Sequence, residues 1–448
     1  MTPGQPQWKN DVLITIQSGQ IVQVCAESAE KNGIRMPGVA IPAIANVHSH
    51  AFQRGFAGLS EFRTAANDSF WTWRKLMYDF VETLTPADVF VIARQLYLEM
   101  IAVGYSWVGE FHYLHNAPQG QRYANGSEMS DAVLRAAHET GIGICLLPVL
   151  YQRSGFDAAT VSRSQQRFAL DDDDYFRLLE NCRKRISDDP NATVAMAFHS
   201  LRAVSREVMN AALEFRNGWQ SGCPVHIHIA EQTLEVDDCL KATGRRSVEY
   251  LLSEFNVDRD WCLIHATHMD QSETESLAES GAVVGLCPTT EANLGDGFFS
   301  AQEFMNRGGV ISVGSDSHCT VDMSEELRTL EYGQRLNTRK RAVLGTDSES
   351  VGRRLYTGCA NGGANAIGIA TGKISPGSRA DWIVVDDEHA SIAGAQTDRL
   401  LDRLIFCSTG CPITNRMIGG HWIENDELQI RLSESSREFL ELNQRLLG

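Results

Sequence analysis

The chain of 448 residues contains no apolar run that approaches the roughly 18 residues of a membrane-spanning helix. Its first residues, MTPGQPQWKNDV, lack the basic start and the apolar stretch of a signal peptide. The eleven cysteines are scattered through apolar segments and include no CxxC pair, so neither a disulfide framework nor a thiolate zinc site is expected. These absences predict a cytoplasmic protein that makes no use of a membrane.

Basic residues are also in the minority, with 40 Lys and Arg against 57 Asp and Glu and a formal net charge of −17. This balance argues against a nucleic-acid backbone as the main partner. An anionic small molecule remains compatible with it, because one pocket can be basic inside an acidic protein. The hydrophobic share of 43% and the charged share of 22% are those of a globular chain and exclude wholesale disorder.

Eight short apolar runs alternate with longer segments that carry apolar residues at helical spacing. The runs are Val39–Val47, Tyr105–Tyr113, Ile142–Leu150, Thr193–Phe198, Pro224–Ile229, Trp261–Ala266, Ala282–Cys287 and Val310–Gly314. Strands separated by helices pair in parallel, and eight such units close a (β/α)8 TIM barrel. The pattern therefore predicts an α/β fold built on this barrel.

The two ends of the chain follow a different pattern. Residues 11–24 alternate like paired strands around a Ser-Gly turn, and short strand-like segments recur at 382–385 and 417–423. We expect residues 1–38 and 370–430 to form one small β-sandwich domain beside a barrel of residues 39–369. Residues 431–448 show helical spacing and predict a C-terminal helix.

Histidines and acids gather where the predicted strands end. The residues at these ends are His48, His50, His112, Tyr113, His199, Arg202, His226, His228, Glu231, His265, His268 and Asp316. Because the active sites of such barrels occupy the C-terminal ends of the strands, residues far apart in sequence would converge on one mouth.

Two histidines spaced by one residue on an extended segment point to the same side, as His48 and His50 do. Alone this spacing is weak evidence, but His228, His265 and Asp316 stand at comparable strand ends. Imidazoles combined with one carboxylate suit zinc, although ligand type alone leaves iron and manganese open. The sequence therefore predicts a metal site at the mouth of the barrel.

Several longer stretches make a resemblance specific. NVHSH, HIHIAEQ, His265 and GSDS together resemble the amidohydrolase superfamily over essentially the whole chain. Six further stretches resemble, within it, the formimidoylglutamate deiminase family of bacterial histidine degradation. They are HSHAFQRGFAG (48–58), FWTWRKLMY (70–78), EFHYLH (110–115), HSLRAV (199–204), CPTTEANLGDG (287–297) and EELRTLEYGQRL (325–336).

The resemblance implies a zinc-dependent hydrolase that converts N-formimino-L-glutamate to N-formyl-L-glutamate and ammonia. The implied ligands of one zinc ion are His48, His50, His228 and Asp316. Zinc lowers the pKa of a bound water toward about 7, so hydroxide would be available to attack the formimino carbon. Residues 192–198 contain no lysine of the kind that bridges two metals in binuclear relatives, which favours a single ion.

Roles for the remaining catalytic groups follow from their positions beside the ligands. Glu231, three residues after His228, is expected to carry a proton from water to the departing nitrogen. Asp316 could also accept a proton from the attacking water. His265 is expected to orient that water or to stabilise developing charge.

Arginines within the resembling stretches indicate what the substrate carries. Arg74 and Arg202 can each bind a carboxylate in bidentate fashion, which suits a small dicarboxylate. Gln53, Tyr113 and His199 are expected to supply further hydrogen bonds to the substrate. The resemblance also makes a homodimer plausible.

Two other functions stay open. A deaminase acting on another amidine, or on an aminated heterocycle such as guanine, could use the same metal site, with Trp71 and Trp73 as stacking surfaces. A catalytically inactive barrel that serves as a scaffold would be expected to have lost ligands that this chain retains. The roles of five histidines are also left open, namely His112, His115, His226, His268 and His318.

Overall fold

The computed structural model describes residues 8–29, 33–62, 69–158, 160–395 and 398–447. Residues 1–7, part of the segment considered for a signal peptide, and Gly448, the end of the expected C-terminal helix, lie outside these ranges. No helix within the described ranges is long and apolar enough to cross a bilayer.

Parallel strands form the barrel in the order β4-β5-β6-β8-β9-β10-β11-β12, with β7 also paired to β6. The strands are β4 (Ile44–Ser49), β5 (Tyr105–His112), β6 (Gly143–Leu150), β7 (Ala192–Val194), β8 (Met196–Phe198), β9 (Val225–Ile229), β10 (Trp261–His265), β11 (Val283–Leu286) and β12 (Val310–Val313). The fourth position is divided, since β7 and β8 pair with successive parts of β6. A parallel bridge between Ser49 and Asp316 joins the two end strands. The predicted (β/α)8 barrel is therefore confirmed.

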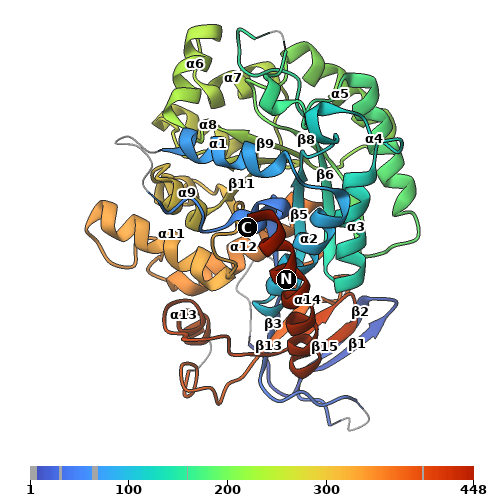
Figure 1. The fold of residues 1–448 in the computed structure, drawn as a ribbon. Helices are drawn as coiled ribbons and strands as arrows, with labels where there is room; N and C mark the ends of the chain where they lie inside the picture. Colours follow the sequence, from blue (N-terminus) through green and yellow to red (C-terminus); the bar gives the residue numbers. More distant parts are fainter. Residues whose placement is uncertain (1–7, 30–32, 63–68, 159, 396–397, 448) are drawn as a thin grey trace.

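Helices surround these strands (Figure 1). They are α1 (Phe70–Val81), α2 (Pro86–Ala102), α3 (Glu128–Thr140), α4 (Asp172–Arg185), α5 (Arg206–Trp219), α6 (Thr233–Thr243), α7 (Ser247–Glu254), α8 (Gln271–Ser280), α9 (Pro288–Leu294), α10 (Ala301–Asn306), α11 (Met323–Thr338) and α12 (Val351–Ile367). The start of α2 illustrates the local signals: the Thr85 hydroxyl accepts from the Asp88 amide at 3.3 Å, and the Asp88 carboxylate accepts from the Thr85 amide at 2.9 Å. Pro86 occupies the first turn, where a helix has no acceptor for a backbone N–H.

Both chain ends contribute to small antiparallel sheets next to the barrel (Figure 1). Strands β1 (Leu13–Gln17) and β2 (Gln20–Cys25) pair with each other, while β3 (Val39–Pro42), β13 (Trp382–Val385), β14 (Ile413–Ile418) and β15 (His421–Glu424) form a four-stranded sheet. Helices α13 (Asp398–Phe406) and α14 (Asn425–Leu447) accompany this sheet. A small β unit built from both chain ends is thus present, as the fold class predicted.

Two predicted boundaries differ from the structure. The run 39–47 is not one barrel strand: β3 pairs antiparallel with β13, and the barrel begins only with β4 at Ile44. Apolar patterning could not reveal this break, because the residues on both sides of it are apolar. The C-terminal helix starts at Asn425, before the expected residue 431, since the acidic residues Asp426 and Glu427 are favourable in a first turn.

The approach of β12 to β4 fixes the catalytic mouth. The Asp316 amide donates to the His48 carbonyl oxygen at 3.0 Å, and the His50 amide donates to the Asp316 carbonyl oxygen at 3.2 Å. Gly314 permits this approach, because a Cβ there would lie 2.7 Å from the backbone nitrogen and oxygen of His48. The barrel therefore closes at the same residues that the sequence predicts as metal ligands.

Candidate metal centre and active site

Four buried side chains from three parts of the barrel converge at its mouth. The Nε2 atom of His48 lies 3.2 Å from Nε2 of His50 and 2.9 Å from Nε2 of His228. The Oδ1 atom of Asp316 lies 3.4 Å from His48 Nε2 and 3.2 Å from His50 Nε2. The four residues expected as ligands are thus brought together.

The hydrogen bonds of these rings reveal which nitrogens carry lone pairs. His50 Nδ1 donates to the carbonyl oxygen of Phe111 at 2.9 Å, and His228 Nδ1 donates to that of His199 at 3.0 Å. A carbonyl oxygen only accepts, so Nδ1 carries a hydrogen in both rings and Nε2 is the nitrogen that faces the cluster. Ring nitrogens and a carboxylate oxygen facing one point could hold a cation, and imidazoles oriented by carbonyl oxygens are typical metal ligands.

Burial keeps the imidazoles of His48 and His228 neutral. It lowers the pKa of His48 to about 3, with a further contribution from His50, and it lowers the pKa of His228 well below 6.5. Burial alone would raise the pKa of Asp316, but the adjacent His48 and His50 hold it well below its usual value. The cluster consequently offers neutral nitrogen and anionic oxygen donors, which fit a divalent ion such as zinc.

His265 stands on the other side of this cluster, between three carboxylates. Its Nε2 atom lies 3.9 Å from Glu231 Oε1 and 4.0 Å from Asp316 Oδ2. Its Nδ1 atom lies 3.2 Å from Glu291 Oε1. Although burial lowers the pKa of His265, Glu231 and the other carboxylates raise it to about 10. The two predicted catalytic residues, Glu231 and His265, are therefore neighbours of Asp316 in space.

Glu291 is a residue of this site that the sequence interpretation left unassigned. It lies in α9, within the quoted stretch 287–297, and its Oε1 atom also accepts from the Cys287 amide at 2.9 Å. These contacts hold the His265 ring in place. Its signal in the sequence was the position of a carboxylate one turn after a predicted strand.

Cys287 lies within ligand distance of His265 and Asp316. Burial raises the pKa of its thiol well above 9, and the carboxylates of Asp316 and Glu291 act in the same direction. Because a metal binds the thiolate and not the thiol, this residue is a poor ligand beside the histidine and aspartate donors.

The residues predicted to bind substrate continue from the metal cluster. Gln53 Nε2 donates to the Tyr113 hydroxyl at 2.8 Å, and the Tyr113 ring lies 4.9 Å from that of His50. His199 follows, with its ring centroid 5.7 Å from Tyr113 and 5.0 Å from His228. Burial lowers the pKa of His199 well below 6.5, and Arg202 acts in the same direction, so this ring is neutral at neutral pH.

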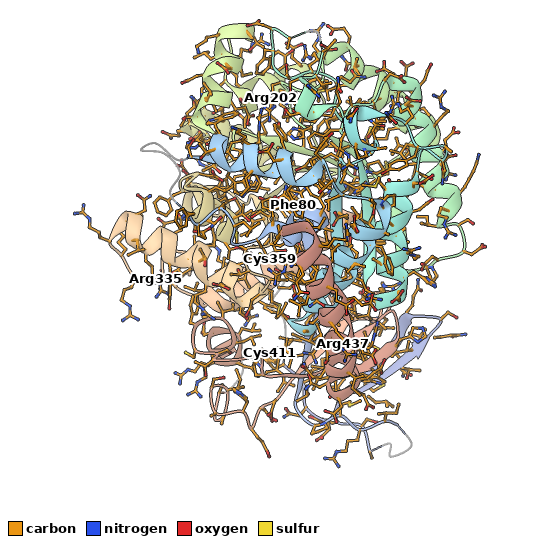
Figure 2. The ribbon with its side chains drawn as sticks, viewed as in Figure 1. Phe80, Arg202, Arg335, Cys359, Cys411 and Arg437 are labelled. Atoms are coloured by element: carbon orange, nitrogen blue, oxygen red, sulfur yellow. The ribbon has the colours of Figure 1, made fainter. Side chains whose placement is uncertain are left out.

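The arginines extend this series of contacts. Arg202 Nη1 donates to the Tyr151 hydroxyl at 3.4 Å, and Tyr151 packs against His199 with ring centroids 4.4 Å apart. The guanidinium of Arg74 lies over Trp71 and Tyr78, 4.9 and 5.3 Å from their ring centroids. Arg202 lies at the end of the molecule opposite Cys411, which is close to the small sheet (Figure 2). Tyr78 and Tyr151 are thus contacts of the arginines that the sequence did not predict.

The five histidines left open lie outside the metal cluster. His226 Nε2 donates to the Ala366 carbonyl oxygen at 2.8 Å, and His115 Nε2 donates to that of Val149 at 2.9 Å. His318 lies behind the ligands, where its two ring nitrogens contact the hydroxyls of Ser315 and Ser49. His112 is buried beside His115, and His268 packs near Gly297. None of these five joins the candidate ligand groups found within the described residues.

Backbone strain marks this rim. Five residues other than glycine have φ between +47° and +71° at the strand ends around the site, namely Ala230, His265, Ala266, Asp316 and His318. Each such conformation costs on the order of 1–3 kcal/mol and persists only where its surroundings determine it. The positions of His265 and Asp316 therefore depend on the main chain as much as on side-chain contacts.

Comparison with known proteins agrees with this architecture. The model of the amidohydrolase family matches residues 39–423, so the chain belongs to the amidohydrolase family and is a hydrolase. A formimidoylglutamate deiminase of Pseudomonas aeruginosa is 42% identical over 98% of this chain and 97% of its own length. A solved amidohydrolase from Brucella melitensis is 41% identical, with a TM-score of 0.92, over 98% of this chain and 97% of its own.

A more distant likeness concerns the fold alone. The structure of an adenosine deaminase from Xanthomonas campestris with bound zinc is 20% identical to this chain, with a TM-score of 0.79. The match covers 97% of this chain and 94% of that one, so the barrel and the small terminal unit are shared together.

Proposed function

We propose that the protein hydrolyses N-formimino-L-glutamate to N-formyl-L-glutamate and ammonia in histidine degradation, with one zinc ion held by His48, His50, His228 and Asp316. The observation that carries this proposal is the pair Arg74 and Arg202 near the metal cluster. Within the described residues, neither guanidinium has a carboxylate within 4 Å. A substrate with two carboxylates would supply the missing counter-charges, and the similarity to a formimidoylglutamate deiminase supports the same choice.

A divalent ion at this cluster would lower the pKa of a water molecule and polarise the formimino group. The residues around it then have separate tasks. Glu231, whose side chain is 13% exposed and lies 3.9 Å from His265, takes a proton from the water that adds to the formimino carbon. It returns this proton to the terminal nitrogen. The hydroxyl oxygen gives up its remaining proton to Asp316 and becomes the formyl oxygen as the carbon–nitrogen bond breaks and ammonia leaves.

His265 stabilises the charge that develops on the attacking oxygen. The carboxylates of Glu231, Glu291 and Asp316 favour the protonated form of this imidazole, which donates from Nε2 while Glu291 holds Nδ1. Asp316 has its carboxylate 4.0 Å from the same ring and accepts a hydrogen bond from the incoming water. This arrangement favours the tetrahedral state over the planar amidine.

The substrate is oriented by groups further from the ligands. Arg74 and Arg202 bind its two carboxylates, while Gln53, Tyr113 and the neutral His199 provide hydrogen bonds between the carboxylate end and the metal. A purine would leave both guanidinium groups without partners, which makes a heterocycle the less favourable substrate.

Ammonia release from the purified, zinc-loaded protein tests the proposal. The assay compares N-formimino-L-glutamate with guanine and adenosine at equal concentrations. We expect turnover of N-formimino-L-glutamate alone. Turnover of a purine by a protein that leaves N-formimino-L-glutamate intact would reject the proposed substrate and keep the deaminase chemistry.

A further inference from the structure

Three buried or half-buried tyrosines surround the carboxylate end of the site. Phe168 forms their common floor, with its ring centroid 5.0 Å from Tyr113, 5.8 Å from Tyr78 and 6.0 Å from Tyr151. Gln165, which is 1% exposed, joins two of these phenols: its Nε2 atom lies 3.1 Å from the Tyr78 hydroxyl and 2.7 Å from the Tyr151 hydroxyl.

The orientation of the Gln165 amide is determined by its other end. Its Oε1 atom accepts from the Ser162 backbone amide at 2.9 Å and from the Ser162 hydroxyl at 2.8 Å. A backbone N–H only donates, so the amide oxygen must face Ser162 and the NH2 group must face the phenols. Each phenol oxygen therefore accepts one of the two amide hydrogens.

The hydrogen bonds that the two phenol oxygens accept from Gln165 limit the directions in which the phenol hydrogens can point. Tyr151 receives a second hydrogen bond from Arg202 Nη1 at 3.4 Å, so its oxygen has both acceptor positions in use. Its O–H, like that of Tyr78, has no acceptor among the described residues. The pKa of Tyr78 is raised to about 12, chiefly by burial, so this phenol keeps its proton at neutral pH.

The guanidinium groups show the same imbalance. Arg74 Nη1 is buried and has no partner within the described part of the chain, while its guanidinium stacks on Trp71 and Tyr78. Arg202 donates to Tyr151, the phenol at the other end of the Gln165 bridge from Tyr78. The site thus contains a group of hydrogen-bond donors that have no acceptor for their remaining hydrogens among the described residues. The group consists of Tyr78, Tyr151, Arg74 and Arg202.

We propose that Tyr78 and Tyr151, held in their donor orientation by Gln165, donate hydrogen bonds to a substrate carboxylate and make this pocket select a carboxylate over a carboxamide. The inference rests on the proposed function, because N-formimino-L-glutamate supplies that carboxylate. A carboxamide would bring an NH2 group against donors alone, so one of its hydrogens would oppose a phenol or guanidinium hydrogen. Gln165 is a positioning residue that acts through the two phenols.

Binding measurements test this proposal without turnover. Isothermal titration calorimetry would compare N-formyl-L-glutamate with its two monocarboxamides, N-formyl-L-glutamine and N-formyl-L-isoglutamine, on the zinc-loaded protein. The variants are Tyr78→Phe, Tyr151→Phe and Gln165→Met, with Tyr332→Phe on α11 as the matched control because Tyr332 is 41% exposed.

We expect the wild-type protein to bind the diacid at least about tenfold more tightly than one of the two carboxamides, the one whose amide replaces the carboxylate of this pocket, since hydrogen bonds to a charged acceptor are strong. The two phenylalanine variants should bind the diacid about tenfold more weakly than the wild type. Their affinity for the carboxamide that discriminates in the wild type should stay unchanged. Gln165→Met should reduce the same discrimination, and Tyr332→Phe should leave it unchanged.

The outcomes separate this proposal from the proposed function. Diacid affinity that is unchanged in both Tyr78→Phe and Tyr151→Phe would overturn the role of the phenols, even if the wild type releases ammonia from N-formimino-L-glutamate. Equal wild-type affinity for the diacid and both carboxamides would overturn the selection. Phenol-dependent binding in a protein that does not act on N-formimino-L-glutamate would sustain the carboxylate pocket and reject only the reaction. The single-atom Tyr-to-Phe variants keep the test valid should Gln165→Met fold poorly.

Discussion

The backbone amide of Asp316 donates to the carbonyl oxygen of His48 at 3.0 Å, so two candidate metal ligands are joined through their main chains as well as through a shared cation site. The same hydrogen bond belongs to the seam between the first and last strands of the barrel. The contact that closes the barrel consequently also aligns these two candidate ligands.

Loss of the proton carrier should abolish turnover while the metal stays bound. Glu231→Gln removes the basic oxygen that accepts the proton of water, and we expect kcat to fall by about 10²–10⁴. Zinc content, measured by atomic emission, should match the wild type because Glu231 is not among the proposed ligands. Glu303→Gln on α10 is the control. Activity of Glu231→Gln near the wild-type level would contradict the assigned role.

Two histidines on the same strand provide a matched test of the metal ligands. His228→Asn should lose bound zinc and activity, because its Nε2 atom faces the cluster at 2.9 Å from His48. His226→Asn should retain zinc, since His226 donates to the Ala366 carbonyl oxygen instead. Zinc content after dialysis without chelator distinguishes the two variants. Loss of zinc from His226→Asn alone would reverse the assignment.

Removal of one guanidinium should weaken substrate binding more than it affects the metal. Arg202→Met keeps much of the side-chain length but loses the charged donor, and we expect KM to rise about tenfold to a hundredfold. Arg437→Met, on the exposed face of α14, is the control for removal of one positive charge (Figure 2). Zinc loss from Arg202→Met with an unchanged KM would place this residue elsewhere.

A methyl group at the barrel seam should disturb the site through the backbone. Gly314→Ala places a Cβ 2.7 Å from the His48 nitrogen and oxygen, so β12 must move away from β4. We expect a lower melting temperature together with lower zinc affinity. Gly358→Ala in α12 meets nothing within 4 Å and should be neutral or stabilise by about 0.5–1 kcal/mol. If Gly314→Ala bound zinc as tightly as the wild type, the alignment of the ligands would not depend on the closure of the barrel.

Stability should depend on pH through Glu235. Burial raises the pKa of Glu235 to about 7, despite the opposing charge of Arg202. Between its unfolded value near 4.5 and about pH 7, the folded state holds a proton that the unfolded state has released, so stability falls as pH rises. Ionisation of Glu235 then lowers the free energy of unfolding by up to about 3 kcal/mol at pH 8.

The neutral isostere isolates this contribution. Glu235→Gln should melt at the same temperature as the wild type at pH 5 and a few degrees higher at pH 8. Scanning calorimetry of both proteins at the two pH values measures the difference. An equal melting temperature at pH 8 would indicate that Glu235 titrates normally.

The barrel and the convergence of the four candidate ligands could be predicted because both leave local signals. Each strand is a short apolar run, and His48, His50, His228 and Asp316 stand immediately at or after strand ends, where parallel topology brings them together. Strand direction leaves a weaker signal: β3 and β4 are both apolar, and only their partners reveal that β3 runs in the small antiparallel sheet.

Residues that act through long-range contacts were beyond the sequence pattern. Gln165 meets Tyr78 and Tyr151 only because α1, the end of β6 and a 3₁₀ turn at Arg163–Gln165 fold over one another. Glu291 was visible as a carboxylate, but its partner His265 lies 26 positions away. Such pairings depend on loop geometry, which residue spacing does not encode.

The left-handed main-chain conformations of His265 and Asp316 bear on any attempt to transplant this catalytic apparatus. Copying only the imidazoles and acids onto another scaffold would let the recipient's loops relax to ordinary torsions, and the side chains would diverge. A successful graft must import the contorted turns along with the reactive groups, and the recipient must be robust enough to sustain them.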